Sequence, residues 1–202
     1  EEHTSGLVFE HEWASAAGLG LVRSARLRAS AQALRVTVLD GVLNLVPPGV
    51  SVAHATTMSS LTDAYKWNQS AAGGRLGLYA LYARIWDRAE PKECFDALVA
   101  WHAGLPPSAQ TLLSDHQVRA FCRGDAIETE TLTRGRKGAF LVHFNSTIDA
   151  QGIEWHQVID SPRSQVQVAE LVRTLDSGGG TPAEIRAAVA ANTAGVDELL
   201  AR

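Results

Sequence analysis

The chain has 202 residues, of which 46% are hydrophobic and 20% are charged, and its net charge is −4. These values are typical of one globular domain with an appendage, and the interspersed charges argue against a nucleic-acid binder or a membrane-surface protein. The longest apolar runs are too short to cross a bilayer and no signal peptide opens the chain, so we expect a cytoplasmic protein. Arg outnumbers Lys and Ala is abundant, which is typical of a bacterial gene of high GC content.

The first third of the chain contains three segments with different patterns. Residues 7–13 alternate between apolar or aromatic and acidic side chains, which predicts a strand. Residues 16–32 are rich in Ala and Arg and favour a helix by propensity, although Gly18 and Gly20 weaken that prediction. Residues 57–69 carry apolar side chains at helical spacing, which predicts a second helix.

An Asp-Gly pair lies between two runs of β-branched and apolar residues. The runs are residues 34–39 and 42–46, and the pair is Asp40-Gly41. Asp-Gly supplies the positive φ angles of a type I′ turn, so this segment predicts a tight hairpin.

The middle of the chain predicts one strand and two helices. Residues 75–86 alternate with apolar side chains on both faces, which suits a central strand. Residues 91–105 and 108–122 each repeat apolar side chains at three- and four-residue intervals, and Pro106-Pro107 separates them. We therefore expect two adjacent helices packed as a pair.

Residues 138–160 form the strongest local pattern in the chain and predict a β-hairpin. The turn is the tetrad from Asp149 to Gly152, between two runs with strand composition. Counting across the turn separates two faces. The apolar face carries Phe140, Val142, Phe144, Ile148, Ile153, Trp155 and Ile159. The polar face carries His143, Asn145, Thr147, Glu154, His156 and Asp160. Residues 127–133, joined through the turn RGRKG, are expected to add a third strand to this meander.

The C-terminal fifth predicts two helices. One begins at Pro162, and the other follows a Gly-rich segment and starts with Thr181-Pro182-Ala183-Glu184, a capping box with Pro at the first helical position. We predict an α+β fold with mostly antiparallel sheet, as β-meander and hairpins, a helical layer on one face and a C-terminal helix after a Gly-rich hinge. Residues 1–176 form the domain, 177–180 a flexible linker, and 181–202 a helical appendage for packing or dimerisation.

The polar face of the predicted hairpin is the first candidate site. His143 or His156 could act as a general base oriented by Glu154 or Asp160, or the imidazoles and carboxylates could hold a metal ion. The same face is also explained as the solvated side of an antiparallel sheet, and imidazoles on neighbouring strands need not converge on a metal. The two cysteines do not form a metal-binding pattern, and we predict no metal and no cofactor.

Two further groups of residues suggest binding. Arg134 and Arg136 concentrate positive charge in one turn, where they could clamp a phosphate or an acidic peptide, or could simply keep an edge soluble. Trp67 stands beside Tyr65 and Asn68 next to a loop and is expected to line a pocket.

Two functional hypotheses follow from these patterns. The first is a non-catalytic binding or accessory protein, as a single chain or a homodimer, that holds a peptide or small molecule against its sheet and uses strand addition. Its ligand-contacting residues are His143, Asn145, Glu154, His156, Arg134, Arg136 and Trp67. The alternative is a small hydrolase- or lyase-like enzyme that uses His143 or His156 with Glu154 or Asp160, with or without a metal.

Overall fold

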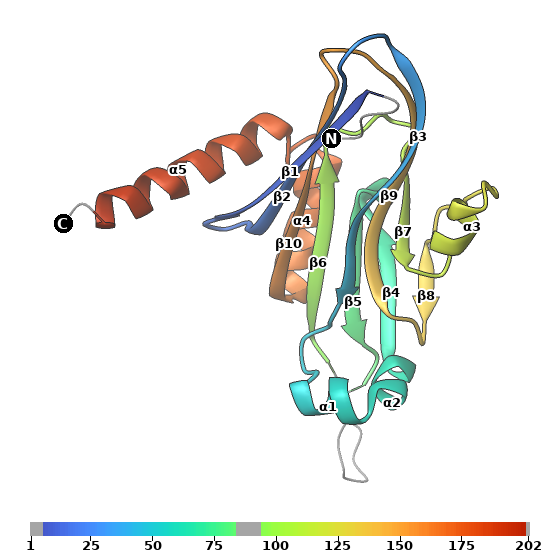
Figure 1. Ribbon diagram of the computed structural model, residues 1–202. Helices are drawn as coiled ribbons and strands as arrows, with labels where there is room; N and C mark the ends of the chain where they lie inside the picture. Colours follow the sequence, from blue (N-terminus) through green and yellow to red (C-terminus); the bar gives the residue numbers. More distant parts are fainter. Residues whose placement is uncertain (1–5, 84–93, 201–202) are drawn as a thin grey trace.

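The computed structural model describes residues 6–83 and 94–200, and within them the chain folds into two antiparallel sheets that face one another (Figure 1). The strands are β1 (Leu7–Ala16), β2 (Gly20–Ala29), β3 (Leu34–Leu45), β4 (Lys66–Ala71), β5 (Leu76–Leu81), β6 (Asp96–Ala103), β7 (Gln110–Ser114), β8 (Leu132–Arg134), β9 (Gly138–Ile148) and β10 (Ile153–Ser164). The helices are α1 (Val52–Thr57), α2 (Ser59–Ala64), α3 (Val118–Cys122), α4 (Gln165–Asp176) and α5 (Pro182–Leu200), with a 3₁₀ turn η1 (Ala72–Gly74). The predicted α+β class with mostly antiparallel sheet and a C-terminal helix is confirmed.

The two sheets differ in size. Sheet A has the strand order β1-β2-β10-β6-β5-β4-β8, and sheet B has the order β3-β9-β7. Because sheet B is much narrower, it covers only part of the inner face of sheet A. We call the face of sheet A that points away from sheet B its outer face.

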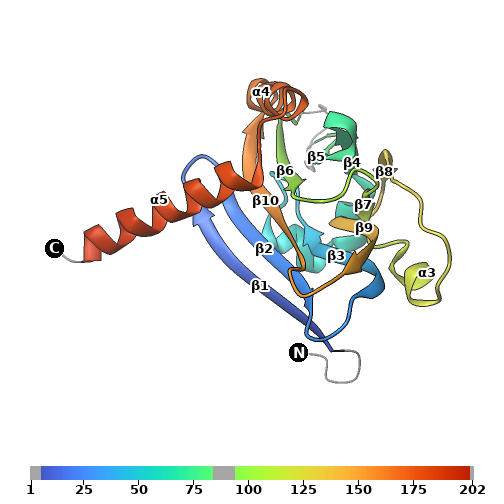
Figure 2. The ribbon, with the colours of Figure 1, turned by 90° about the horizontal axis from the view of Figure 1, so that it is seen from above.

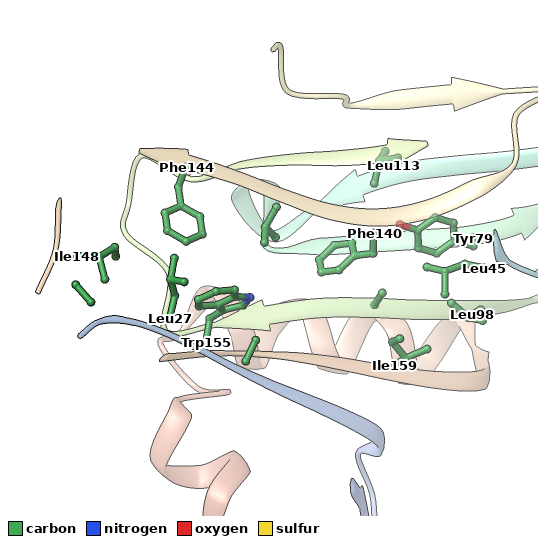
Figure 3. Packing of buried hydrophobic residues seen from close by; sticks show 14 residues of the cluster. Leu27, Leu45, Tyr79, Leu98, Leu113, Phe140, Phe144, Ile148, Trp155 and Ile159 are labelled. Carbon is green, nitrogen blue, oxygen red and sulfur yellow. The ribbon is translucent and has the colours of Figure 1, made fainter. Parts of the chain in front are cut away.

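The main hydrophobic core fills the space between the sheets (Figure 3). Trp155 of β10 is fully buried and packs edge-on against Phe144 of β9, with ring centroids 5.5 Å apart. Tyr79 of β5 reaches across the core and donates a hydrogen bond of 2.5 Å to the carbonyl oxygen of Ala139 in β9. Aromatic side chains from both sheets therefore hold the sandwich together.

A buried polar network also joins the two sheets. Arg23 of β2 donates to both carboxylate oxygens of Asp40 in β3, at 2.6 and 2.7 Å, and to Oε1 of Gln157 in β10 at 2.9 Å. The indole N–H of Trp155 donates to the same carboxylate at 2.9 Å. Arg23 is only 6% exposed, so its charge depends on this one carboxylate for compensation.

Two helices cover the outer face of sheet A, as Figure 2 shows from above. α4 begins with a capping box formed by Ser164 and Gln167, and α5 begins with the predicted reciprocal bonds between Thr181 and Glu184. Their apolar stripes pack with Trp101, Val22 and other outer-face residues in a second cluster. The first half of α5 lies on the sheet, while its second half projects from the body (Figures 1 and 2).

The predicted hairpin over residues 138–160 is wrong in its pairing. The turn at Asp149–Gly152 is present, but β9 pairs with β3 and β7 in sheet B, whereas β10 pairs with β2 and β6 in sheet A. The predicted apolar residues of the two strands meet across the core, face to face, instead of side by side within one sheet. The polar face predicted from the hairpin register consequently does not exist, because its residues point away from the core on opposite sides of the sandwich.

The predicted hairpin at Asp40-Gly41 is also wrong, because β3 runs through this pair without a turn. Asp40 belongs to the buried polar network, and Gly41 is required because the backbone of β9 lies very close to it. A Cβ on Gly41, whose φ is +152°, would lie 2.1 Å from the carbonyl oxygen of Phe140. Here the glycine reflects strand packing and not a tight turn.

Most of the helices predicted in the first two thirds of the chain are replaced by strands. Residues 16–32 contain β2, and 57–69 contain only the short α2 before β4 begins. The described part of 91–105 contains β6, and 108–122 contains β7 and the short α3. β6 is buried on both faces, so most of its residues are apolar. A continuous apolar run also contains apolar residues three and four positions apart, which is why the sequence predicted a helix there.

Other local predictions hold. Residues 7–13 lie in β1, the described part of 75–86 contains β5, and 139–147 lie in β9. Of the strand predicted at 127–133 only β8 forms, and it pairs with β4 in sheet A and does not extend a meander. The helix predicted from Pro162 begins three residues later, because β10 continues to Ser164.

Candidate functional site

A groove lies on the outer face of sheet A, beside α4. It has a volume of about 520 Å³ and extends over β4, β5 and the start of β6, the part of the face that α4 leaves uncovered. Its apolar lining comes from the sheet, the segment before β6 and one wall of α4: Trp67, Leu78, Ala80, Tyr82, Phe95 and Val168. We call this feature the outer groove.

The alternation of side chains along β5 determines which residues form the floor of the outer groove. Tyr79 and Leu81 of β5 point into the core, so Leu78 and Ala80 point outward and meet Trp67 of the neighbouring strand, which pairs with Ala80. At the rim, the side chains of Tyr82 and Phe95 are 62% and 57% exposed. Aromatic groups left in water beside an apolar hollow are typical of ligand-binding sites.

A cation is stacked on the tryptophan of the groove. Arg134 of β8 pairs directly with Trp67 of β4, and its guanidinium lies 4.1 Å from the centroid of the indole ring. At the other end of the groove Arg163 is paired with Asp160, so its charge is already compensated. Within the described residues no carboxylate pairs with Arg134. Its guanidinium does not line the groove itself but stacks on Trp67, which does, so its positive charge is available to an anionic group beside the groove.

The structure brings Trp67 and Arg134, two of the predicted site residues, into one site. Arg136 follows in the same turn with an exposed side chain, and its carbonyl oxygen accepts a hydrogen bond from Asn68 at 3.5 Å. Arg136 therefore contributes to the fold through its backbone carbonyl, while its side chain is exposed to solvent.

His143 and Asn145 lie elsewhere, on the outer face of sheet B. Nδ1 of His143 is 2.8 Å from Oε1 of Gln110, and its ring meets Phe121 edge-on. Oδ1 of Asn145 accepts a hydrogen bond of 2.7 Å from Thr37. Burial lowers the pKa of His143, which favours the neutral form of the imidazole.

Glu154 and His156 lie together on the outer face of sheet A, next to α5. Nε2 of His156 is 3.5 Å from Oε1 of Glu154, and its Nδ1 is 2.9 Å from Oγ of Ser24 in β2. Burial lowers the pKa of His156, although the Glu154 carboxylate acts in the opposite direction. Ser24 and Glu154 line a hollow of about 290 Å³. Asp160 contributes nothing here, because it pairs with Arg163.

Sequence patterns missed two parts of these arrangements. Ser24 pairs with His156 in the sheet although they are 132 positions apart in the chain, and no local signal connects them. The second part is the apolar lining of the groove, Leu78, Ala80 and Phe95, because the sequence alone does not distinguish these residues from residues of the hydrophobic core. Only the position of α4 shows which apolar residues remain uncovered.

Comparison with known proteins does not assign the chain to a family. No protein-family model matches the chain, and no curated protein shows significant similarity to it. Among residues 6–83 and 94–200, no three His, Cys, Asp or Glu side chains converge as metal ligands. No helix in those two ranges has the length and apolar character needed to span a membrane.

Proposed function

We propose that the chain is a non-catalytic binding protein that holds a small molecule or an extended peptide in the outer groove, against sheet A. The observation that carries the proposal is an apolar groove whose tryptophan stacks on the guanidinium of Arg134, a group that pairs with no carboxylate among residues 6–83 and 94–200. This combination fits a ligand with an apolar body and one acidic group. The apolar part would lie on Leu78 and Ala80, and the acidic group would reach Arg134.

The proposal predicts saturable binding of 8-anilinonaphthalene-1-sulfonate, an apolar aromatic probe with one sulfonate. We expect Trp67→Ala to weaken its binding by about tenfold, because the substitution removes a wall of the groove and the support of Arg134. Arg134→Gln should weaken binding by about threefold. Fluorescence titration measures both effects.

Two variants serve as matched controls for that titration. Arg136→Gln removes a charge from the same turn, and Trp13→Ala removes an exposed tryptophan from β1; neither residue lines the groove or stacks on Trp67. Equal binding by all four variants and the unsubstituted protein would place the probe elsewhere and defeat the proposal.

A second candidate function, a hydrolase, rests on the contact of Ser24, His156 and Glu154. A neutral imidazole with its proton on Nε2 presents a lone pair on Nδ1 to the Ser24 hydroxyl, which is how a general base activates a serine. Nε2 lies 3.5 Å from Glu154 and makes no hydrogen bond to it. Around Ser24, however, the described backbone offers no free N–H group to an oxyanion. β2 is paired on both sides by β1 and β10, so the backbone N–H groups around Ser24 are engaged in the sheet.

We therefore expect a fluorophosphonate probe to leave Ser24 unmodified, and intact-mass spectrometry measures this directly. Modification of Ser24 that disappears in His156→Gln would instead favour the hydrolase over the binding protein. The variant Ser30→Ala, which removes the hydroxyl of an exposed serine just after β2, controls for nonspecific labelling.

A further inference from the structure

β1 is a long edge strand with one unused side. It pairs only with β2, in an uninterrupted register from Leu7↔Ala29 to Ala16↔Gly20. Along its other side no strand of the described chain is bonded to it, so its outward N–H and C=O groups remain available for pairing.

The other sheet edges are less suited to accept a strand. β8 at the far edge of sheet A has only three residues. In sheet B both edge strands are irregular, since the register shifts between Leu43 and Leu45 in β3 and between Leu112 and Ser114 in β7. Short strands and bulges prevent edge pairing, and β1 has neither.

The apolar stripe of α5 continues beyond the sheet on the side of β1. Ile185 and Val189 pack on the outer face, and Asn192 donates a hydrogen bond of 3.3 Å to Ser15 at the end of β1. Continuing at helical spacing, the same stripe contains Val196, Leu199 and Leu200, which are 47%, 69% and 80% exposed. The second half of α5, which carries these exposed apolar residues, projects beyond the sheet on the side of β1 (Figure 2).

The part of α5 that extends beyond β1 is long enough to cover one additional strand. Eight residues of α5 follow the contact at Asn192, which is about 12 Å of helix. Neighbouring strands lie about 4.8 Å apart, so a strand added to β1 would pass beneath the projecting half of α5. We propose that β1 and α5 together form an acceptor site for an extended segment of a partner protein, which pairs with β1 as an eighth strand of sheet A.

The side chains of β1 specify the chemistry of that segment. Glu10 and Glu12 point to the outer face, where they line the hollow shared with Glu154, while Phe9 and Trp13 point to the open side of the sandwich and are 41% and 50% exposed. Cross-strand neighbours lie on the same face. The fitting segment therefore alternates basic residues, opposite the glutamates, with apolar residues, opposite the aromatic rings.

The same charges disfavour a second copy of this chain as the occupant. Antiparallel self-pairing centred on His11 or Glu12 places glutamates of one copy opposite glutamates of the other. Like charges directly opposite are destabilising in a sheet. A basic partner segment gains from the Glu12 carboxylate and shares the Glu10 carboxylate with Arg28, whose Nε lies 3.7 Å from it.

The test uses the full chain and a fluorescent synthetic peptide of about ten residues that alternates Lys and Val. We expect saturable binding by fluorescence anisotropy, at least about tenfold weaker for a peptide that alternates Glu and Val. The double variant Glu10→Lys/Glu12→Lys should reverse this preference, and Leu199→Asp/Leu200→Asp should weaken binding of the Lys peptide.

Two peptide controls separate strand pairing from simple charge attraction. N-methylation of alternate residues on the edge that faces β1 should abolish binding, whereas N-methylation on the opposite edge should leave it intact. Absence of binding, or equal loss with either methylated peptide, would overturn the proposal. So would a concentration-dependent dimer in sedimentation that His11→Pro, in the middle of β1, disrupts, since β1 would then accept a second copy. Trp67→Ala should bind the peptide normally, so this site and the outer groove can fail independently.

Discussion

Replacing Asp40 by Ala should lower the free energy of unfolding by about 3–5 kcal/mol, one of the two largest effects that we expect from single substitutions. The change leaves the Arg23 guanidinium buried between the sheets with only the Gln157 amide oxygen as acceptor, and it removes the acceptor of the Trp155 indole. Breaking one partner of a buried ion pair strands an uncompensated charge. Urea denaturation measures the effect.

Two comparisons make this prediction specific. Asp125→Ala removes an ion pair with Arg123 that is exposed on both sides, and it should cost less than about 1 kcal/mol. The double variant Arg23→Met/Asp40→Leu should recover most of the stability, because it removes both charges together. A loss below about 1 kcal/mol for Asp40→Ala would show that water reaches Arg23 and that the network is not a buried one.

Acidification should destabilise the fold by about 3 kcal/mol through His102 alone. Burial lowers the pKa of His102 to about 4, and the Arg75 guanidinium acts in the same direction. The unfolded chain takes up a proton near the ordinary pKa of 6.5, whereas the folded chain does so only near 4. Stability contributed by the neutral imidazole is therefore complete above about pH 6.5 and is lost as the pH falls through 4.

His102→Gln should flatten this part of the pH profile, measured by urea denaturation between pH 7 and pH 4. Some slope should remain, because burial also lowers the pKa of His143 and His156 with the same sign. His11→Gln, at an exposed position of β1, is the matched control for the replacement of a histidine. A slope equally steep in His102→Gln and the unsubstituted protein would contradict the assignment.

Features specified by neighbouring residues could be predicted from the sequence. The start of α5 follows from Thr181, Pro182 and Glu184, which satisfy the first N–H groups of the helix locally. The strand period of β1 and β9 is equally local. These elements were predicted correctly because no distant contact opposes the local preference.

Pairing between strands could not be predicted in the same way. Asp40-Gly41 is a turn by local chemistry, yet Arg23, Trp155 and the backbone of Phe140 use this pair inside a strand. Similarly, the turn after Asp149 suits a hairpin, but it connects two sheets. In both places the free energy of packing between sheets outweighs the local preference.

In the candidate site, too, individual residues could be predicted from the sequence but their arrangement in space could not. Trp67 and Arg134 were each expected to contact a ligand, but their stacking depends on the pairing of β4 with β8. The groove between them and α4 depends on which apolar surface remains uncovered after the helices have packed. Alternation along one strand shows which residues share a face and leaves open whether another element covers that face.

The central position of β10 has a consequence for how the chain is synthesised. β10 joins β2 to β6 in sheet A, and contacts such as that of Arg23 with Gln157 span 134 positions of sequence. On the ribosome, β2 and β6 therefore emerge as open edges well before the strand that closes them. Completion of the sheet is a late, long-range event, so the nascent chain carries its strongest aggregation risk until residues 153–164 have left the exit tunnel.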